Sequence, residues 1–357
     1  YPAQIALLLP LSGTHQKAAE AIRDGFLTKY YGDNASANKP RVQVYDTTST
    51  NDIQGLYMQA VNEGADFVIG PLMKEKVLEL SRLSAYQMKA PVLALNFNPQ
   101  IRRAPDNFYQ FALDPEDEVQ QLAERIWQKN YRHPAIIVPK NTWGQRIEKA
   151  FNEKWESMGG KSAQSVAISD KGDSAKAIRD LLLVDESMER SKIIKNAIRE
   201  KVDYQIRRRQ DLDLVVLAAP PEQARQIKPL LNFYFAHDLP VYATSSVYIG
   251  QPTPSKDQDV NGVIFCDMPW LLMTDQKSYA TKALITKHWP EEANMYARLF
   301  AMGVDAYELT SEIPMLQAEP YREYQGATGM LSLTPDHRIN RRLVWAQFSR
   351  GAPKVID

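Results

Sequence analysis

Hydrophobic and polar positions alternate along the chain in blocks of two lengths. Short unbroken runs of Val, Ile, Leu and Ala are followed by longer segments whose apolar residues recur at helical spacing. Such runs are typical of strands buried on both faces of a parallel sheet, and their alternation with helices predicts a doubly wound α/β fold. We expect strands at 5–9, 42–46, 67–70, 91–95, 108–113, 134–139, 163–169, 213–219 and 240–244. We expect helices near 15–30, 52–63, 74–88, 174–184 and 222–236.

The series of strand–helix units occurs twice. It repeats after Asp114, which predicts two similar Rossmann-like lobes rather than one large sheet. The second series opens with DPEDE, where Asp114 can cap a helix, Pro115 suits its first turn and the acidic residues 116–118 complement its dipole. Near the end, 328–333 and 342–348 flank TPDHRINR and predict a β-hairpin.

One segment does not follow this alternation of strands and helices. Between two expected elements lies ESMERSKIIKNAIREKVDYQIRRRQ, in which Ile194, Ile198, Val202 and Ile206 fall every four residues. This spacing puts them on one stripe, and the segment is too long for an ordinary loop, so we expect an added surface helix over 187–206.

Three arginines follow the expected helix. In the simplest interpretation Arg207, Arg208 and Arg209 are a solvated helix end that complements the helix dipole. The alternative interpretation is a docking patch for an acidic protein, and these three residues are our candidate partner surface.

Composition narrows the classes of function. The chain has 357 residues with 43 basic and 43 acidic side chains, so no global field favours nucleic acid or an anionic membrane. The single cysteine, Cys266, lies in an apolar run and is expected to be a buried packing residue. The first residues enter a strand almost at once, from which we expect a domain cut from a longer or processed chain.

Motifs for catalysis and cofactors are missing from the sequence. MGGKS at 158–162 resembles the tail of a P-loop, but Trp155 stands where that motif needs glycine and the order of strand and helix is reversed. No G-x-G-x-x-G follows a strand, no G-x-S-x-G elbow exists, and the five histidines show no metal-ligand spacing. We therefore predict no enzyme, no cofactor, no metal and no catalytic residue.

Loops at the carboxyl ends of parallel strands are where a two-lobed α/β protein holds a ligand. Each of these loop residues also has a simpler explanation as a helix cap or a turn residue. Our candidate residues for a central cleft are Ser12, Thr47, Leu72, Met73, Asn96, Asn98, Thr142, Trp143, Ser245 and Ser246.

The order of these pieces resembles the type I periplasmic binding protein fold, in the branch that holds amino-acid receptors. The resemblance rests on IALLLPLSG, VIGPL, TWGQRIEKAFNEKWESMGG, YARLFAMGVDAYELT and ATGMLSLTPDHR. It implies two lobes with a central cleft, joined by crossings near Asp114, Ser246 and Arg322. The expected lobes are 1–114 with 247–321, and 115–246 with 322–357.

The expected cleft differs from that of amino-acid receptors. Those receptors tend to carry Ser or Thr where this chain has Leu72, Met73 and 96–97, and a tyrosine where it has Trp143. A zwitterion would therefore find few charge-assisted partners here.

A narrower resemblance is to the LppC/LpoA family of penicillin-binding protein activators. It rests on PVLALN, ALDPEDE, NGVIFCDMPW, GMLSL with LVWAQFSRG, and the long block from RRRQDLDLVVLAAPPEQ to YATSSVYIG. This resemblance implies a non-enzymatic, outer-membrane-anchored lipoprotein that binds and activates a bifunctional class A penicillin-binding protein from the periplasm, in peptidoglycan synthesis and cell-shape maintenance. It also implies an N-terminal helical domain and a lipid anchor outside this chain.

The alternative function is a solute-binding receptor that holds an amino acid, a peptide or a wall fragment between its lobes. The identity of any such small ligand is unknown from the sequence. Leu72 and Met73 then either pack across a closed cleft or join a surface that meets protein.

Overall fold

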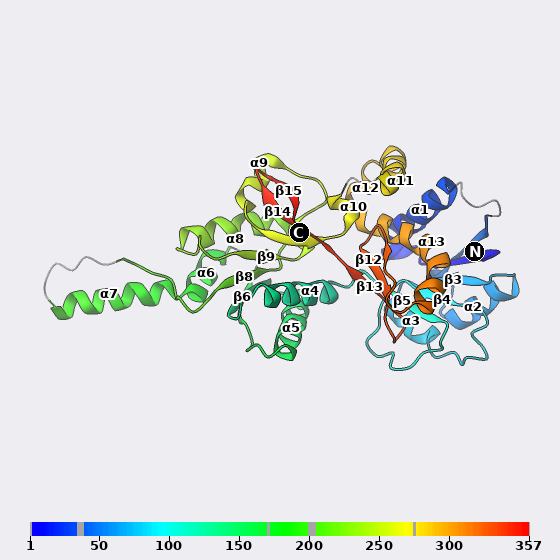
Figure 1. Ribbon diagram of the computed structural model, residues 1–357, viewed down its shortest axis with the longest axis horizontal. Helices are drawn as coiled ribbons and strands as arrows, with labels where there is room; N and C mark the ends of the chain where they lie inside the picture. Colours follow the sequence, from blue (N-terminus) through cyan, green and yellow to red (C-terminus); the bar gives the residue numbers. More distant parts are fainter. Residues whose placement is uncertain (1, 34–38, 170–171, 199–204, 274–275, 357) are drawn as a thin grey trace. The chain divides into compact units, whose positions relative to one another are not determined.

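Two β-sheets organise the chain, one in each of two units. This computed structural model describes residues 2–33, 39–169, 172–198, 205–273 and 276–356. The first unit comprises 1–114 and 268–343, and the second comprises 115–267 and 344–357 (Figure 1).

The first unit is built on an eight-stranded sheet with the order β11-β12-β13-β5-β4-β3-β1-β2. Its strands are β1 (Gln4–Leu9), β2 (Arg41–Asp46), β3 (Phe67–Ile69), β4 (Val92–Ala94), β5 (Phe108–Phe111), β11 (Tyr324–Gln325), β12 (Met330–Leu333) and β13 (Arg338–Arg342). Its α-helices are α1 (Gln16–Gly32), α2 (Ile53–Asn62), α3 (Lys74–Leu80), α10 (Pro269–Leu272), α11 (Gln276–His288), α12 (Glu292–Met295) and α13 (Ala297–Ala318). Short 3-10 turns at Gly13–His15 and Thr47–Ser49 follow β1 and β2.

The second unit is built on a seven-stranded sheet with the order β15-β14-β10-β9-β8-β6-β7. Its strands are β6 (Pro134–Pro139), β7 (Gln164–Ile168), β8 (Leu214–Leu217), β9 (Val241–Ala243), β10 (Ile264–Asp267), β14 (Val344–Ser349) and β15 (Ala352–Ile356). Its α-helices are α4 (Pro115–Gln128), α5 (Thr142–Ser157), α6 (Ser174–Leu182), α7 (Val184–Ile198), α8 (Pro221–Phe233) and α9 (Pro254–Asp257), with 3-10 turns at Ser245–Val247 and Gln258–Val260.

The five parallel strands of each sheet follow the same order. In each unit the second strand pairs with the first, the first with the third, and the fourth and fifth follow in turn. This 2-1-3-4-5 order belongs to doubly wound folds. The prediction of two similar Rossmann-like lobes is therefore confirmed.

The strands are buried on both faces, as their unbroken apolar runs predict. In β1, Ile5, Leu7 and Leu9 pack into one hydrophobic cluster, whereas Ala6 and Leu8 pack into a second cluster on the other face. Alternate residues of a strand point to opposite faces, so the two clusters are the two cores of one sheet.

Two crossings between the units lie later along the chain than the expected ones. We expected them near Ser246 and Arg322, whereas they fall at 267/268 and 343/344; the crossing after Asp114 agrees. The physical reason is strand pairing. Strand β10 pairs with β9 and β14 in the second sheet, and β13 pairs with β5 in the first.

The expected C-terminal hairpin also differs in part. Strand β12 pairs with β13, with Leu333 opposite Ile339, so the hairpin closes over 334–337. The expected second arm, 342–348, is divided between the sheets, because Arg342 ends β13 whereas 344–348 belongs to β14 of the other sheet. The expected helix at 74–88 is shorter, since α3 ends at Leu80.

Candidate functional site

The turns after β1 and β2 are joined by a network of hydrogen bonds around Asp46. The Ser12 hydroxyl donates to the Asp46 carboxylate at 3.3 Å and is hydrogen-bonded to the Thr48 hydroxyl, and the backbone N–H of Leu11 donates to Asp46 at 2.9 Å. Burial raises the pKa of Asp46, but the hydrogen bonds from Thr48, Leu11 and Ser12 together lower it below its usual range. The Thr47 hydroxyl is buried and has no hydrogen-bond partner among the described residues.

The residues after β3 and β4 bind one another. The Asn96 side chain donates to the carbonyl of Leu72 at 2.8 Å, and the Asn98 side chain donates to the carbonyl of Lys74 at 2.9 Å. Leu72 is half-buried against the core of its unit, and Met73 precedes α3 without a side-chain cap. These contacts tie two neighbouring loops together at the carboxyl edge of the sheet.

The corresponding residues of the second unit are also engaged locally. The Glu118 carboxylate accepts hydrogen bonds from the backbone N–H and the hydroxyl of Ser245, and the Ser246 hydroxyl donates to the carbonyl of Ala219 at 3.0 Å. Glu118 thus serves more than the helix dipole, because it also holds the turn after β9.

The last two candidate residues, Thr142 and Trp143, lie at the start of α5. Asn141 caps α5 by accepting from the N–H of Gly144 at 2.9 Å, and Thr142 is the first, exposed residue of the helix. Trp143 packs half-buried against the core of the second unit. That these loop residues bind a small ligand stays a prediction.

The three arginines expected to form one surface patch have different roles. Arg208 is only 6% exposed, and its guanidinium donates two hydrogen bonds to Asp238, at 3.2 and 2.5 Å. Arg209 binds Asp211 through two bonds, at 2.7 and 2.5 Å. Arg207 alone of the three has an exposed side chain. The patch is therefore narrower than its sequence suggests, because two of its charges are paired within the fold.

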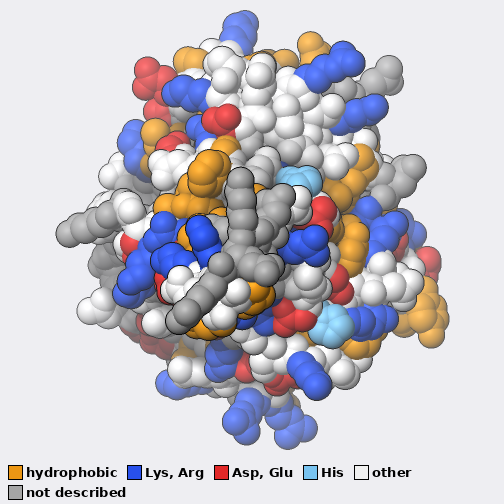
Figure 2. Space-filling view, turned by 90° about the vertical axis from the view of Figure 1, so that its left-hand side faces the viewer, with side chains coloured by type: hydrophobic (Ala, Val, Ile, Leu, Met, Phe, Trp, Pro, Cys, Tyr) orange, Lys and Arg blue, Asp and Glu red, His pale blue; other side chains and the backbone are white. Residues whose placement is uncertain are grey.

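Helix α7 confirms the first part of the added helix and presents its apolar residues to solvent. The helix covers Val184–Ile198. The expected positions 199–204, with Val202, lie outside the described residues, and Ile206, which was expected to end the helix, is not helical. Ile193, Ile194 and Ile198 are 65%, 49% and 51% exposed. The helix leaves the body of its unit beside α6 (Figure 1), and Figure 2 shows Lys and Arg side chains next to hydrophobic ones around its end.

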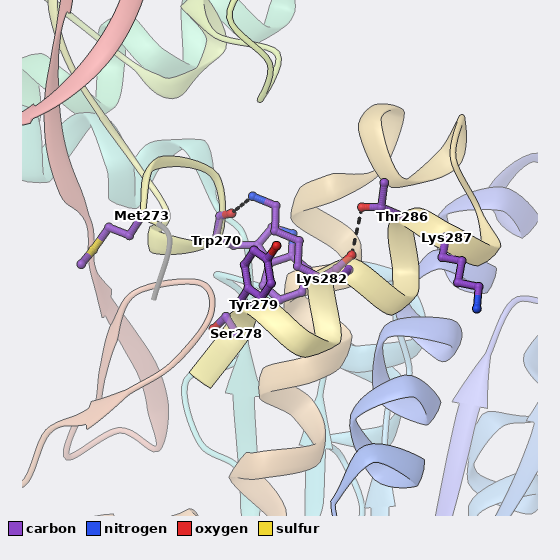
Figure 3. A pocket seen from close by; sticks show the side chains of 8 residues that line it. Trp270, Met273, Ser278, Tyr279, Lys282, Thr286 and Lys287 are labelled. Carbon is purple, nitrogen blue, oxygen red and sulfur yellow. Dashed lines mark hydrogen bonds between the residues drawn. The ribbon is translucent and has the colours of Figure 1, made fainter. Parts of the chain in front are cut away.

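A pocket of about 500 Å³ lies over α10 and α11 in the first unit. Trp270, which is 3% exposed, Tyr279 and Met273 form its apolar surface, and Lys282 and Lys287 carry its positive charge. In Figure 3 the Lys282 ammonium reaches the carbonyl of Trp270, at 2.6 Å. The sequence analysis missed this site. The sequence feature that could have indicated it is the composition of α11, whose thirteen residues include Lys and His but no Asp or Glu.

No group of three or more His, Cys, Asp or Glu that could hold a metal occurs among the residues that the structure describes. Within those residues, no helix has the length and apolar character needed to cross a membrane. Cys266 is buried in β10.

Relatives of known role match nearly the whole chain. The penicillin-binding protein activator LpoA of Vibrio antiquarius is 32% identical, over 98% of this chain and 58% of the relative. The activator LpoA of Vibrio cholerae is 30% identical, over 97% of this chain and 57% of the relative. The chain thus spans less than two thirds of the length of these relatives.

Solved structures agree with the fold. The C-domain of LpoA from Haemophilus influenzae, described as a regulator of PBP1A, has a TM-score of 0.76 and 27% identity, covering 99% of this chain and all of that domain. The leucine-binding protein LivK of Thermotoga maritima has a TM-score of 0.54 at 13% identity, covering 99% of this chain and 98% of that protein, which shows likeness of fold alone. The type I periplasmic binding protein fold is therefore confirmed. Because the model of the LppC lipoprotein family matches residues 1–351, the chain belongs to that family.

Proposed function

We propose that this chain is a non-enzymatic regulatory part of a periplasmic lipoprotein that binds and activates a bifunctional class A penicillin-binding protein. The observation that carries the proposal is the match of 99% of this chain to a domain described as a regulator of PBP1A. In the whole lipoprotein, a lipid anchor outside this chain tethers it to the inner leaflet of the outer membrane. The proposed activity is the stimulation of peptidoglycan synthesis by protein–protein contact.

The proposed contact surface is the end of α7 together with Arg207. Three isoleucines on one side of an exposed helix are unusual for a surface, and such patches mark sites of interaction. Lys195 lies in the same half of the helix, which has no acidic residue after Glu189, whereas Lys192 is paired with Glu189 at 2.6 Å. We expect the partner to offer an apolar groove with acidic groups at its rim.

The base of α7 is firmly anchored, which favours a role in presentation. The backbone N–H of Arg209 donates to the carbonyl of Leu182 at 2.9 Å, and that of Arg207 donates to the Ser187 hydroxyl at 3.2 Å. The buried guanidinium of Arg208 holds Asp238 beside them. These bonds fasten the segment 207–209 to the start of α7. Because the base of the helix is held in this way, binding through its far end costs less conformational entropy.

Activation then follows from differential affinity. A regulator that binds one conformation of the synthase more tightly than another shifts the population toward the first. No catalytic group of the regulator is needed for this effect.

The test is a titration of the labelled chain with a purified cognate class A penicillin-binding protein at several salt concentrations. We expect saturable binding that weakens with salt, and a tenfold or greater loss of affinity in Ile194→Asp and in Arg207→Glu. Lys149→Glu, on the exposed face of α5, is the matched control and should bind as the unchanged chain does. A folded chain that fails to bind contradicts the proposed function, whereas binding that ignores both α7-side substitutions contradicts only the proposed surface.

A further inference from the structure

The end of α8 exposes two phenylalanines to solvent. Phe233, the last residue of the helix, is 73% exposed, and Phe235 is 44% exposed. The other large hydrophobic side chains exposed among the described residues of the second unit are the isoleucines of α7, Ile249 and Val355. Phe233 and Phe235 are therefore its exposed aromatic ones, and exposed aromatic groups are enriched where proteins bind one another.

The backbone at Phe235 is one that glycine normally occupies. The N–H of Phe235 donates to the carbonyl of Asn232 at 3.3 Å. The N–H of Ala236 donates to the carbonyl of Leu231 at 2.9 Å, which completes the Schellman motif that ends many helices. Phe235 has the left-handed position of this motif, with a φ of 66°, where a Cβ is strained.

The ring of Phe235 is not needed to end the helix. A Schellman motif is normally accompanied by a hydrophobic contact, which Leu231 and Ala236, both fully buried, can supply. Glycine would form the same two hydrogen bonds without the strain. Strain that is kept at an exposed position is typical of residues with a function.

The phenylalanines lie beside the base of α7. The ring of Phe233 packs edge-on against Tyr234, with centres 5.0 Å apart, and the guanidinium of Arg179 lies 6.0 Å from the centre of the Tyr234 ring. Arg179 also forms an ion pair at 3.3 Å with Asp185 in the first turn of α7. Helix α6, which carries Arg179, packs against α8 (Figure 1). The α8 patch, defined as Phe233, Tyr234 and Phe235, is therefore continuous with the base of α7.

Helix α7 alone is small for a stable protein–protein interface. A standard interface buries about 800 Å² of each partner, over roughly 20–30 residues, which is more than the exposed isoleucines of one helix offer. Ile193 follows Asp185 by about two helical turns, so it lies about 80° around the helix from Asp185 and about 12 Å along it. A surface of about 800 Å² is about 30 Å across, so Ile193 and the α8 patch fit within one interface.

Two ion pairs border the α8 patch. Arg179 pairs with Asp185, and Arg208 pairs with Asp238, shortly after Phe235 in the sequence. A charged group of a partner would compete with these pairs, whereas an apolar group gains free energy by covering the rings. We propose that the α8 patch is a second contact for the synthase of the proposed function, on which this inference rests, and that it meets an apolar, uncharged part of that protein.

The experiment measures two quantities for each variant of the chain: its affinity for a purified cognate class A penicillin-binding protein, and its melting temperature. Phe235→Gly should weaken binding at least fivefold because the ring is lost. Its melting temperature should stay the same or rise, because glycine relieves the strain. A residue that served only the fold would lower the melting temperature when replaced.

A second variant and a control connect the loss to the α8 patch. Phe233→Ser should also weaken binding at least fivefold. In both variants the loss should be the same at low and high salt, whereas the loss in Arg207→Glu should depend on salt. Tyr86→Ser removes a ring that is 96% exposed in the first unit, and it should bind as the unchanged chain does.

The outcomes separate this inference from the proposed function. Unchanged binding in Phe233→Ser and Phe235→Gly overturns the second contact alone, whereas a folded chain that does not bind the synthase contradicts both. A fall of several degrees in the melting temperature of Phe235→Gly also overturns it, because the ring would then serve the fold. Sedimentation of the chain alone tests a second copy as the occupant. A dimer that Phe233→Ser abolishes, with synthase binding unchanged, overturns the proposal.

Discussion

Asp305 of α13 binds Thr328 through two hydrogen bonds to one carboxylate oxygen. The backbone N–H of Thr328 donates at 2.7 Å and its hydroxyl at 2.5 Å, while the other oxygen accepts from the N–H of Ala327 at 2.6 Å. Asp305 is fully buried. A buried carboxylate with three donors holds the turn before β12 on the central helix of the first unit, and Gly326 is small because a Cβ there would meet this carboxylate.

We expect Asp305→Ala to lower the free energy of unfolding by about 3 kcal/mol, because it leaves two buried backbone N–H groups without an acceptor. Chemical denaturation measures this difference. Asp259→Ala, at an exposed position, is the control and should change the free energy by less than about 0.5 kcal/mol. Equal effects of the two substitutions would show that the hydrogen bonds of Asp305 contribute nothing to stability.

The same residue should make stability depend on pH. Burial raises the pKa of Asp305 to about 7, although the hydrogen bonds from Thr328 and Ala327 lower it. The unfolded chain has a value of about 3.9, so the folded state favours the neutral acid. Its stabilising contribution is complete below about pH 4 and is lost as the pH rises through 7. The free energy of unfolding should therefore fall with pH relative to that of Asp305→Asn, and parallel curves would contradict the raised pKa.

The fold was largely predictable because its strongest signals are local. The apolar run of β1 and the acidic start of α4 after Asp114 each fix an element within a few residues. The crossings between the units were misplaced because they depend on pairing between distant segments, such as β10 with β14. No local pattern reports that pairing.

The candidate sites were less predictable, and Arg208 shows why. Its partner Asp238 is thirty positions away in the sequence, so a run of arginines looked like one exposed patch. The pocket beside Trp270 was missed for a related reason, since it forms where α10 and α11 meet in space. The absence of acidic residues from α11 could have directed attention to it.

The neighbouring arginines provide a matched pair for a stability test. We expect Arg208→Ala to cost about 2 kcal/mol, because it removes a buried ion pair whose other member, Asp238, is half-exposed and remains partly hydrated. Arg207→Ala should cost less than about 0.5 kcal/mol because its side chain is exposed. Urea denaturation of both variants checks the difference, and a large loss in Arg207→Ala would mean that this residue also has a structural role.

Close approach of α1 and α13 depends on two glycines. A Cβ at Gly303 would overlap the carbonyl oxygen of Ile22, and one at Gly25 would overlap that of Phe300. Gly303→Ala should force the helices apart and lower the free energy of unfolding by about 3 kcal/mol. Gly32 lies at the end of α1, and a Cβ there would meet no atom of another described group within 4 Å. Gly32→Ala should therefore be neutral or slightly stabilising. A neutral Gly303→Ala would show that the two helices can separate without loss.

The last prediction separates the proposed regulator from a solute receptor. A free amino acid needs partners for both its charges, yet the Asn96 amide and the Ser245 hydroxyl already bind protein groups. Leu72 and Trp143 stand where a receptor would offer hydroxyl groups, and both pack against the cores of their units. We therefore expect no rise in the melting temperature of the chain with any of the common amino acids.

A ligand at 100 times its Kd would add about 2.7 kcal/mol to the free energy of unfolding, which a thermal scan detects easily. A leucine-binding protein scanned with leucine serves as the positive control. A clear rise for this chain with a free amino acid would favour the receptor, because regulation by protein contact predicts no such response.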